Sequence, residues 1–205
     1  MPLDQACRDE DVWPDCLKLD VEGAELQVLE GGERAAAKAL VLDVEVEFAP
    51  LRAGQPLFAD VDAHLRGRGW SLLGVRRVHW RRSAGLDPRG TGYGGQLTQA
   101  DALYYNAALV RAGLSQVMAL KLVLILAAYR QLDLALEHVR APRGPLSGLE
   151  GAERRELERL LLERPSAVTR LLKRVSRRLD SARRRALVDV LQPGDAQTWQ
   201  DSHFF

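Results

Sequence analysis

The segment from Pro14 to Gly31, PDCLKLDVEGAELQVLEG, constrains the fold of this chain more than any other stretch. Its first half carries the apolar residues of a strand: Cys16, Leu17, Leu19 and Val21. An acidic turn with a glycine follows at once, and a helical pattern begins directly after it. A strand, a polar turn and a helix in this order are typical of an open α/β sheet, where ligands bind beyond the carboxyl ends of the strands. The sequence therefore predicts a site at the turn from Asp20 to Gly23.

A second strand is predicted from the strict alternation of residues between Leu40 and Phe48. The even-numbered positions are apolar and share one face, while Asp43, Glu45 and Glu47 share the other. Burying unpaired acidic groups is costly, so we expect this second face to meet solvent. The alternative is that Glu45 and Glu47, which end the strand, line a pocket.

The remaining pattern of the first half predicts an α/β domain over residues 1–110 with a mainly parallel sheet and one antiparallel strand. Its predicted elements are a helix from Gln55 to Gly67, a strand from Trp70 to Val78 that continues to Trp80, a glycine-rich loop from Gly85 to Gly95, and a short strand from Ala102 to Asn106.

Residues 111–205 are predicted to form an all-α region. A long apolar helix is expected from Leu114 to Arg140, because Pro142 and Pro145 interrupt the chain only after it. Amphipathic helices are expected at residues 148–164, 166–179 and 181–191. The longest apolar run, from about Val117 to Tyr129, is too short for a membrane crossing, and the N-terminus does not resemble a signal peptide. We therefore expect a cytoplasmic protein without membrane contact.

Residues 151–185 are strongly basic, with twelve Lys or Arg against five Asp or Glu, although the formal net charge of the chain is only +1. We do not expect nucleic acid as a partner for this segment, because neither stacking aromatic residues nor a DNA-binding motif accompanies the charge. A solvated helix face above a stripe of leucines explains the pattern. The alternative is a non-enzymatic interaction module that docks an anionic partner through these basic helices.

Several segments of the first half resemble the FkbM family of S-adenosylmethionine-dependent methyltransferases. They are Leu3-Asp4, LKLDVEGAELQVLEG at residues 17–31, residues 41–48, GQPLFADVDAHL at residues 54–65, residues 77–82, and GGQLTQADALYY at residues 94–105. The resemblance implies a Rossmann-like sheet of seven strands in the order 3-2-1-4-5-7-6, with the last strand antiparallel. The four strands read here resemble the last four, which is the C-terminal part of the catalytic domain.

The resemblance also implies a glycine-rich turn that wraps the cofactor, and no G-x-G follows a strand before Asp20. We therefore expect a truncated chain that is weak or inactive alone, and whether it is an enzyme by itself stays open. The strand from Cys16 to Val21 is expected to be buried on both faces, with an edge that finds no partner in this chain. A second chain or self-association would then complete the sheet; an enzyme split over two polypeptides is one form of this.

The activity implied by the resemblance is transfer of a methyl group from S-adenosylmethionine to a hydroxyl of a small polar acceptor, such as a sugar or a natural-product intermediate. At the matching positions, Asp20 and Glu22 would be catalytic, orienting the hydroxyl or acting as general base. Asp20 and Gly23 would lie by the cofactor, and Glu45 and Glu47 by the acceptor. The competing interpretation of Asp20 and Glu22 is interaction with the dipole of the helix that follows. No metal is expected, because same-face carboxylates on one strand are a weak signal.

Overall fold

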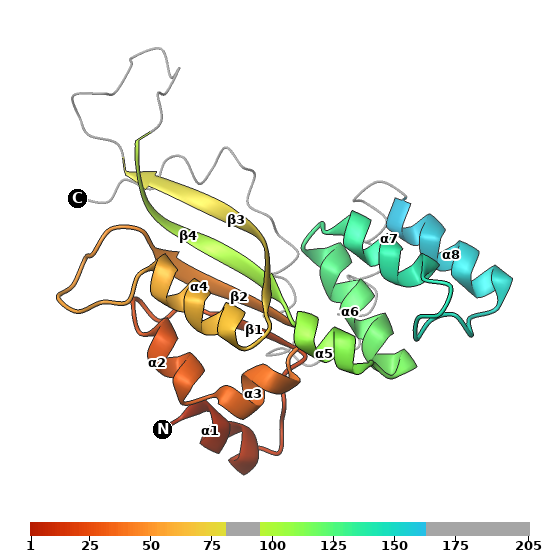
Figure 1. The fold of residues 1–205 in the computed structure, drawn as a ribbon, viewed down its shortest axis with the longest axis horizontal. Coiled ribbons are helices and arrows are strands. Elements are labelled where there is room, and N and C mark those ends of the chain that lie inside the picture. Colours follow the sequence, from red (N-terminus) through yellow and green to blue (C-terminus); the bar gives the residue numbers. More distant parts are fainter. Residues whose placement is uncertain (81–94, 163–205) are drawn as a thin grey trace. The chain divides into compact units, whose positions relative to one another are not determined.

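The computed structural model describes residues 1–80 and 95–162. The chain divides into two compact units, residues 1–112 and residues 113–205. The first unit contains a four-stranded sheet (Figure 1). In spatial order its strands are β1 (Cys16–Leu19), β2 (Val41–Glu47), β4 (Gln96–Tyr105) and β3 (Ser71–Trp80). Strands β1 and β2 are parallel, and β4 runs antiparallel to both β2 and β3. The prediction of a mixed α/β unit with one antiparallel strand is confirmed, although β4 begins six residues earlier than expected.

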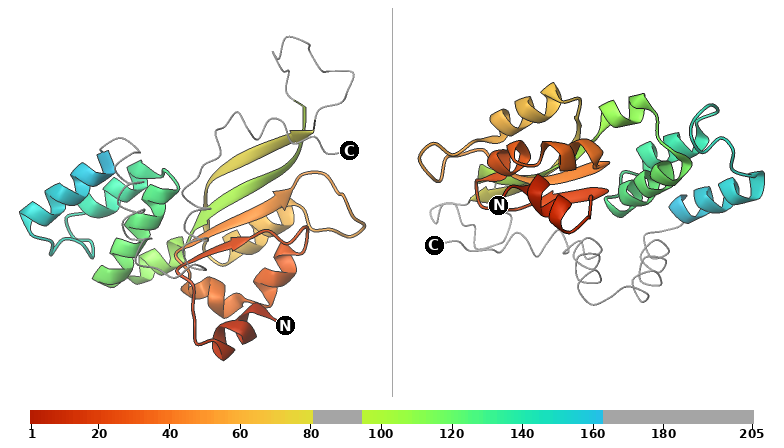
Figure 2. Two further views of the ribbon diagram at one scale, coloured as in Figure 1. Left: turned by 180° about the vertical axis from the view of Figure 1, so that it is seen from behind. Right: turned by 90° about the horizontal axis from the view of Figure 1, so that it is seen from below.

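The helices of the first unit are α1 (Leu3–Asp9), α2 (Glu25–Glu30), α3 (Glu33–Lys38), α4 (Phe58–Gly67) and α5 (Ala107–Ala112). Helices α2, α3 and α4 lie on one face of the sheet (Figure 2). The apolar side chains of that face and of these helices form one core, which includes Leu29, Leu42, Val44, Leu65 and Tyr104. The sheet thus has a helix-covered apolar face, and the candidate site must be sought on its other face and at the strand ends.

Strand β2 alternates as predicted, but its acidic face does not simply meet solvent. Leu42, Val44 and Val46 are fully buried in the core. Asp43 and Glu47 on the opposite face are only 2% and 3% exposed, so the expectation of a solvated acidic face is wrong at these two positions. Tertiary partners make this burial tolerable, since Arg76 of β3 reaches to within 3.2 Å of the Asp43 carboxylate.

Strand β1 is an edge of the sheet, and β2 is its only strand partner within residues 1–80 and 95–162. The expectation that this edge finds no strand partner anywhere in the chain stays a prediction, because it also concerns residues outside the described ranges. The expectation that β1 is buried on both faces is wrong. Leu19 lies in the core, whereas Lys18 is exposed on the opposite face. The strand alternates in burial because Leu19 lies on the face that α2, α3 and α4 of the first unit cover (Figure 2).

The second unit is helical in its described part, with α6 (Gln116–Ala128), α7 (Leu132–Arg140) and α8 (Gly151–Leu162). The single helix predicted from Leu114 to Arg140 is in fact two helices. Arg130 has a φ of +60°, its N–H donates to Ala127 O, and the N–H of Gln131 donates to Leu126 O. This pair of hydrogen bonds is the Schellman ending of a helix. Glycine commonly takes this left-handed position, so an arginine there gave no signal in the sequence.

Some expectations fall outside the described residues: nearly all of the loop from Gly85 to Gly95, the helices at 166–179 and 181–191, and most of the basic segment 151–185. Where that segment is described, Arg159 pairs with Glu156 at 2.5 Å and Arg140 of α7 pairs with Glu158 at 3.0 Å. Arg159, Glu156 and Glu158 of this segment therefore form ion pairs within the protein itself. Among the described residues, no helix is both long and apolar enough to cross a membrane.

Candidate functional site

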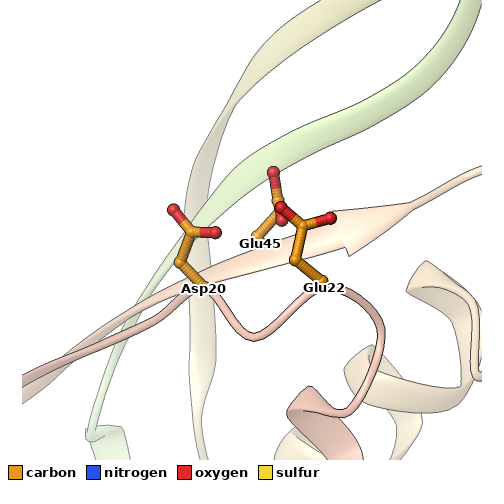
Figure 3. Close-up of side chains that lie close together, drawn as sticks. All are labelled: Asp20, Glu22 and Glu45. Atoms are coloured by element: carbon orange, nitrogen blue, oxygen red, sulfur yellow. The ribbon is translucent and has the colours of Figure 1, made fainter.

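The carboxyl ends of β1 and β2 bring three acidic side chains together. Asp20 and Glu22 lie on the turn between β1 and α2, and Glu45 lies on β2 (Figure 3). One carboxylate oxygen from each of the three falls within 4.8 Å of the others. Two segments that are distant in the sequence therefore form one acidic cluster, as the α/β arrangement predicts for neighbouring parallel strands.

Glu45 is the half-buried member of this acidic cluster. Its Oε1 accepts a hydrogen bond of 2.8 Å from Nε2 of Gln99 on β4. Burial, and then the nearby negative charge of Asp20, raise the pKa of Glu45 to about 7, with smaller contributions from Glu22 and Glu47. The hydrogen bond from Gln99 opposes this shift because it favours the ionised form. The cluster thus contains one carboxyl group that exchanges its proton near neutral pH.

A lysine lies beside the acidic cluster on the same face of the sheet. Lys18 Nζ is 3.4 Å from Asp20 Oδ2 and 3.1 Å from Asp101 Oδ1 on β4. Partial burial alone would lower the pKa of Lys18, but Asp101 and the other nearby carboxylates outweigh that effect and raise it. Lys18 therefore stays protonated and offsets part of the negative charge around Asp20.

Glu47, the other residue that the sequence assigned to the acceptor, is not part of the acidic cluster. It is buried at the end of β2, where Glu25 and Arg52 are its charged neighbours. Burial, and then the charge of Glu25, raise the pKa of Glu47 above its usual range. Of the two candidates on β2, Glu45 is the one that shares a surface with Asp20 and Glu22.

Gly23 has a φ of +99°, a backbone conformation that glycine adopts without steric cost. A Cβ at this position would lie 2.3 Å from Nε2 of Gln55, a residue of the loop between β2 and α4. The sequence-based expectation placed Gly23 by the cofactor, whereas in the structure a side chain of the protein itself lies against this glycine. Asp20, by contrast, carries an exposed carboxylate that can accept hydrogen bonds from a hydroxyl-bearing ligand.

Carboxylate oxygens at this spacing can also ligate a hard divalent cation. Asp20 and Glu22 are exposed, however, and exposed acidic groups often lie together without an ion. No second observation in the described part of the chain points to a cation, and we assign no metal to the cluster.

Residues 1–72 match the family model of the methyltransferase FkbM domain. The resemblance read from the sequence is confirmed for this segment. Neither the search of curated proteins nor the search of solved structures found a match.

The FkbM match encloses all five predicted site residues: Asp20, Glu22, Gly23, Glu45 and Glu47. It also covers the loop that carries Arg52 and Gln55. It ends at residue 72, so Gln99 and Asp101, which contact Glu45 and Lys18, lie beyond it. The family-like segments noted at residues 77–82 and 94–105 are likewise outside the matched range.

Sequence reasoning missed Glu25, the first residue of α2. Its side chain is only 2% exposed, and its carboxylate accepts hydrogen bonds from Val21 N at 2.8 Å and from Gly23 N at 3.0 Å. It thereby satisfies two backbone donors of the turn that carries the cluster. The available signal was a glutamate two residues after the glycine, at the start of a helix whose N-cap, Ala24, has no capping side chain.

Proposed function

We propose that this chain contributes the acceptor side of an FkbM-type methyltransferase that methylates a hydroxyl group of a small polar molecule, such as a sugar or a natural-product intermediate. The observation that carries the proposal is the FkbM match over residues 1–72. Within it, Asp20, Glu22 and Glu45 converge at the carboxyl ends of two parallel strands, where ligands bind in open α/β sheets.

The order of the four strands supports the same proposal. The sheet runs β1-β2-β4-β3 with β4 antiparallel. The family resemblance implies this order for the last four strands of its seven-stranded sheet, in which the final strand is inserted between its two predecessors. The acidic cluster then occupies the ends of the strands that would be fourth and fifth in the complete sheet.

The residues of the cluster suit a hydroxyl acceptor. Carboxylates accept hydrogen bonds from hydroxyl groups and thereby orient them. Glu45, whose pKa lies at about 7, is half ionised near neutral pH, so its ionised form is a suitable acceptor for the proton that a methylated hydroxyl must lose. S-adenosylmethionine would supply the methyl group, and the exposed carboxylate of Asp20 would accept hydrogen bonds from its hydroxyls.

Cofactor binding is testable on the isolated chain by titrating it with S-adenosylhomocysteine and following backbone amide signals by NMR. We expect the signals of residues 20–23 to move, and those of α1 in the same unit to stay fixed. Because no G-x-G motif precedes Asp20 in the sequence, we expect saturation only above low-micromolar concentrations. Asp20→Asn should weaken the response. Shifts that avoid residues 20–23 altogether would contradict the proposal.

The acceptor class is testable by incubating the chain with labelled S-adenosylmethionine and a panel of small polyols and sugars. We expect methyl incorporation, however slow, to fall about 100-fold or more in Glu45→Gln, in line with loss of a general base. Glu10→Gln, which changes an exposed carboxylate at the end of α1, is the matched control and should leave the rate unchanged. Equal rates in the two variants would remove Glu45 from the proposed role.

A further inference from the structure

The turn that carries Asp20 and Glu22 has a left-handed backbone conformation at two successive residues, and it is unfavourable at Glu22. Glu22 has a φ of +57° and Gly23 has a φ of +99°. A non-glycine residue in the left-handed region costs of the order of 1 kcal/mol, and such a conformation persists only where the surroundings impose it. The neighbours that impose it decide whether Glu22 stays beside Asp20 and Glu45.

Glu25 holds the turn from within. Its buried carboxylate accepts hydrogen bonds from the N–H groups on both sides of Glu22, those of Val21 and Gly23. A buried carboxylate without donors would be costly, so these contacts stabilise the turn and the position of Glu25 together. Release of both amides would leave the buried carboxylate of Glu25 without these donors.

The loop between β2 and α4 holds the turn from outside. Arg52 donates from Nη1 to the carbonyl oxygen of Glu22, and its Nη2 lies 3.8 Å from Glu22 Oε2. Gln55 fixes this loop, because its Oε1 accepts hydrogen bonds from Leu51 N at 3.0 Å and Arg52 N at 3.1 Å. The amide nitrogen of Gln55 packs against Gly23, so the two loops interlock at the end of the sheet.

We propose that Glu25, Arg52 and Gln55 are positioning residues that clamp the turn after β1 and so hold Asp20 and Glu22 against Glu45. The clamp is formed by two interlocked loops at the ends of the two strands that carry the acidic cluster. The inference rests on the proposed function only in regarding the cluster as an acceptor site. The position of the turn that the clamp holds can be measured without a methyl donor or an acceptor.

The first test measures amide hydrogen exchange in the full chain. In Glu25→Ala, the protection of the Val21 and Gly23 amides should fall about 10-fold, which corresponds to the loss of one hydrogen bond to a charged group. The amides of Val44 and Val46 in β2 should keep their protection and so show that the fold is intact. Glu30→Ala, an exposed change on the same helix, is the matched control and should leave all four amides unchanged.

The second test reports on the position of the turn rather than on its stability. If the clamp fails, Asp20 and Glu22 move away from Glu45, and the pKa of the Glu45 carboxyl, followed by carbon NMR, falls toward its ordinary value. Glu25→Gln keeps an oxygen that accepts hydrogen bonds, so it should leave this pKa closer to that of the natural protein than Glu25→Ala does.

Arg52→Ala distinguishes loss of the clamp from a direct charge effect, because the two would change the pKa of Glu45 in opposite directions. Removing a nearby positive charge would by itself raise the pKa of Glu45, whereas releasing Glu22 would lower it. We expect a fall. Arg52 is exposed, so this variant remains informative even if Glu25→Ala does not fold. An unchanged or raised pKa in Arg52→Ala, or full protection of the Gly23 amide in Glu25→Ala, would overturn the proposal. A chain with an intact clamp that fails to respond to S-adenosylhomocysteine would instead count against the proposed function.

Discussion

Gln99 donates a hydrogen bond of 2.8 Å from Nε2 to Oε1 of Glu45, across the antiparallel pair of strands β4 and β2. The donor comes from a strand beyond the FkbM match, and the acceptor lies within it. The ionisation of Glu45 is thus balanced between two opposing influences. Burial and the acidic turn favour the neutral form, and the amide of Gln99 favours the charged one.

The first prediction concerns the pH dependence of stability. The folded-state pKa of Glu45 is about 7 against a reference value of 4.5, so the folded protein binds the proton more tightly than the unfolded chain. The stability from this group is full below pH 4.5 and is lost as the pH rises through about 7. In Glu45→Gln this loss is absent. Relative to the natural protein, the variant should gain about 1 kcal/mol between pH 4.5 and 8, after allowance for solvent screening of a half-buried group.

Urea denaturation at a series of pH values measures this difference. Glu10→Gln, which removes an exposed carboxylate at the end of α1, is the matched control. Two parallel stability curves for the natural protein and Glu45→Gln would show that Glu45 titrates normally in the folded state.

The second prediction concerns Asp4, whose carboxylate accepts hydrogen bonds from Arg34 N at 3.1 Å and Ala35 N at 2.8 Å. These donors lie in the first turn of α3, so Asp4 performs the part of a helix cap from a distant position in the sequence. Asp4→Ala should lower the free energy of unfolding by about 1 kcal/mol. The measurement is the midpoint of thermal unfolding, compared between Asp4→Ala and the control Glu10→Ala, a change at the other end of α1. Equal midpoints in the two variants would disprove the capping role.

The third prediction concerns Tyr104, a fully buried residue of β4 whose hydroxyl donates a hydrogen bond of 3.0 Å to Asp62 Oδ1 on α4. Burial, followed by the charge of Asp62, raises the pKa of this hydroxyl, so it stays protonated and keeps donating. Tyr104→Phe should cost about 1–2 kcal/mol in denaturant unfolding, since the ring is kept and one hydrogen bond to a charged group is lost. Tyr105→Phe, on the other face of the strand, should cost less; the reverse order would contradict the assignment.

The fourth prediction compares two glycines with positive φ. A Cβ at Gly23 would meet the Gln55 amide at 2.3 Å, whereas a Cβ at Gly54, with a φ of +71°, would have no heavy atom within 4 Å. Gly54→Ala should therefore cost only backbone strain, about 1 kcal/mol. Gly23→Ala should cost at least about 1 kcal/mol more, because Gln55 must move as well. Equilibrium unfolding of both variants measures the difference, and similar costs would mean that Gln55 yields freely.

Part of the candidate site was predictable from the order of residues. The carboxylates of Asp20 and Glu22 follow one strand directly, and Glu45 lies near the end of the next, so parallel pairing had to bring them to one edge. Gln99 and Glu25 were not predictable as partners. A glutamine fifty-four residues away gives no local sign of its contact with Glu45, and Glu25 is one of several acidic residues near the start of α2.

The sequence by itself determined the periodicities: which residues of β2 share a face, where the acidic turn follows β1, and that the described part of the second unit is helical. These properties depend on residues that are close together in the sequence, so a sequence pattern can predict them. Only the tertiary structure decided how the acidic face of β2 is buried beside Arg76, how α6 ends at Arg130, and how two loops interlock around Gly23. Each of these outcomes depends on contacts between residues distant in the sequence or on a single backbone torsion. Neither produces a periodic pattern of residue types from which it could be predicted.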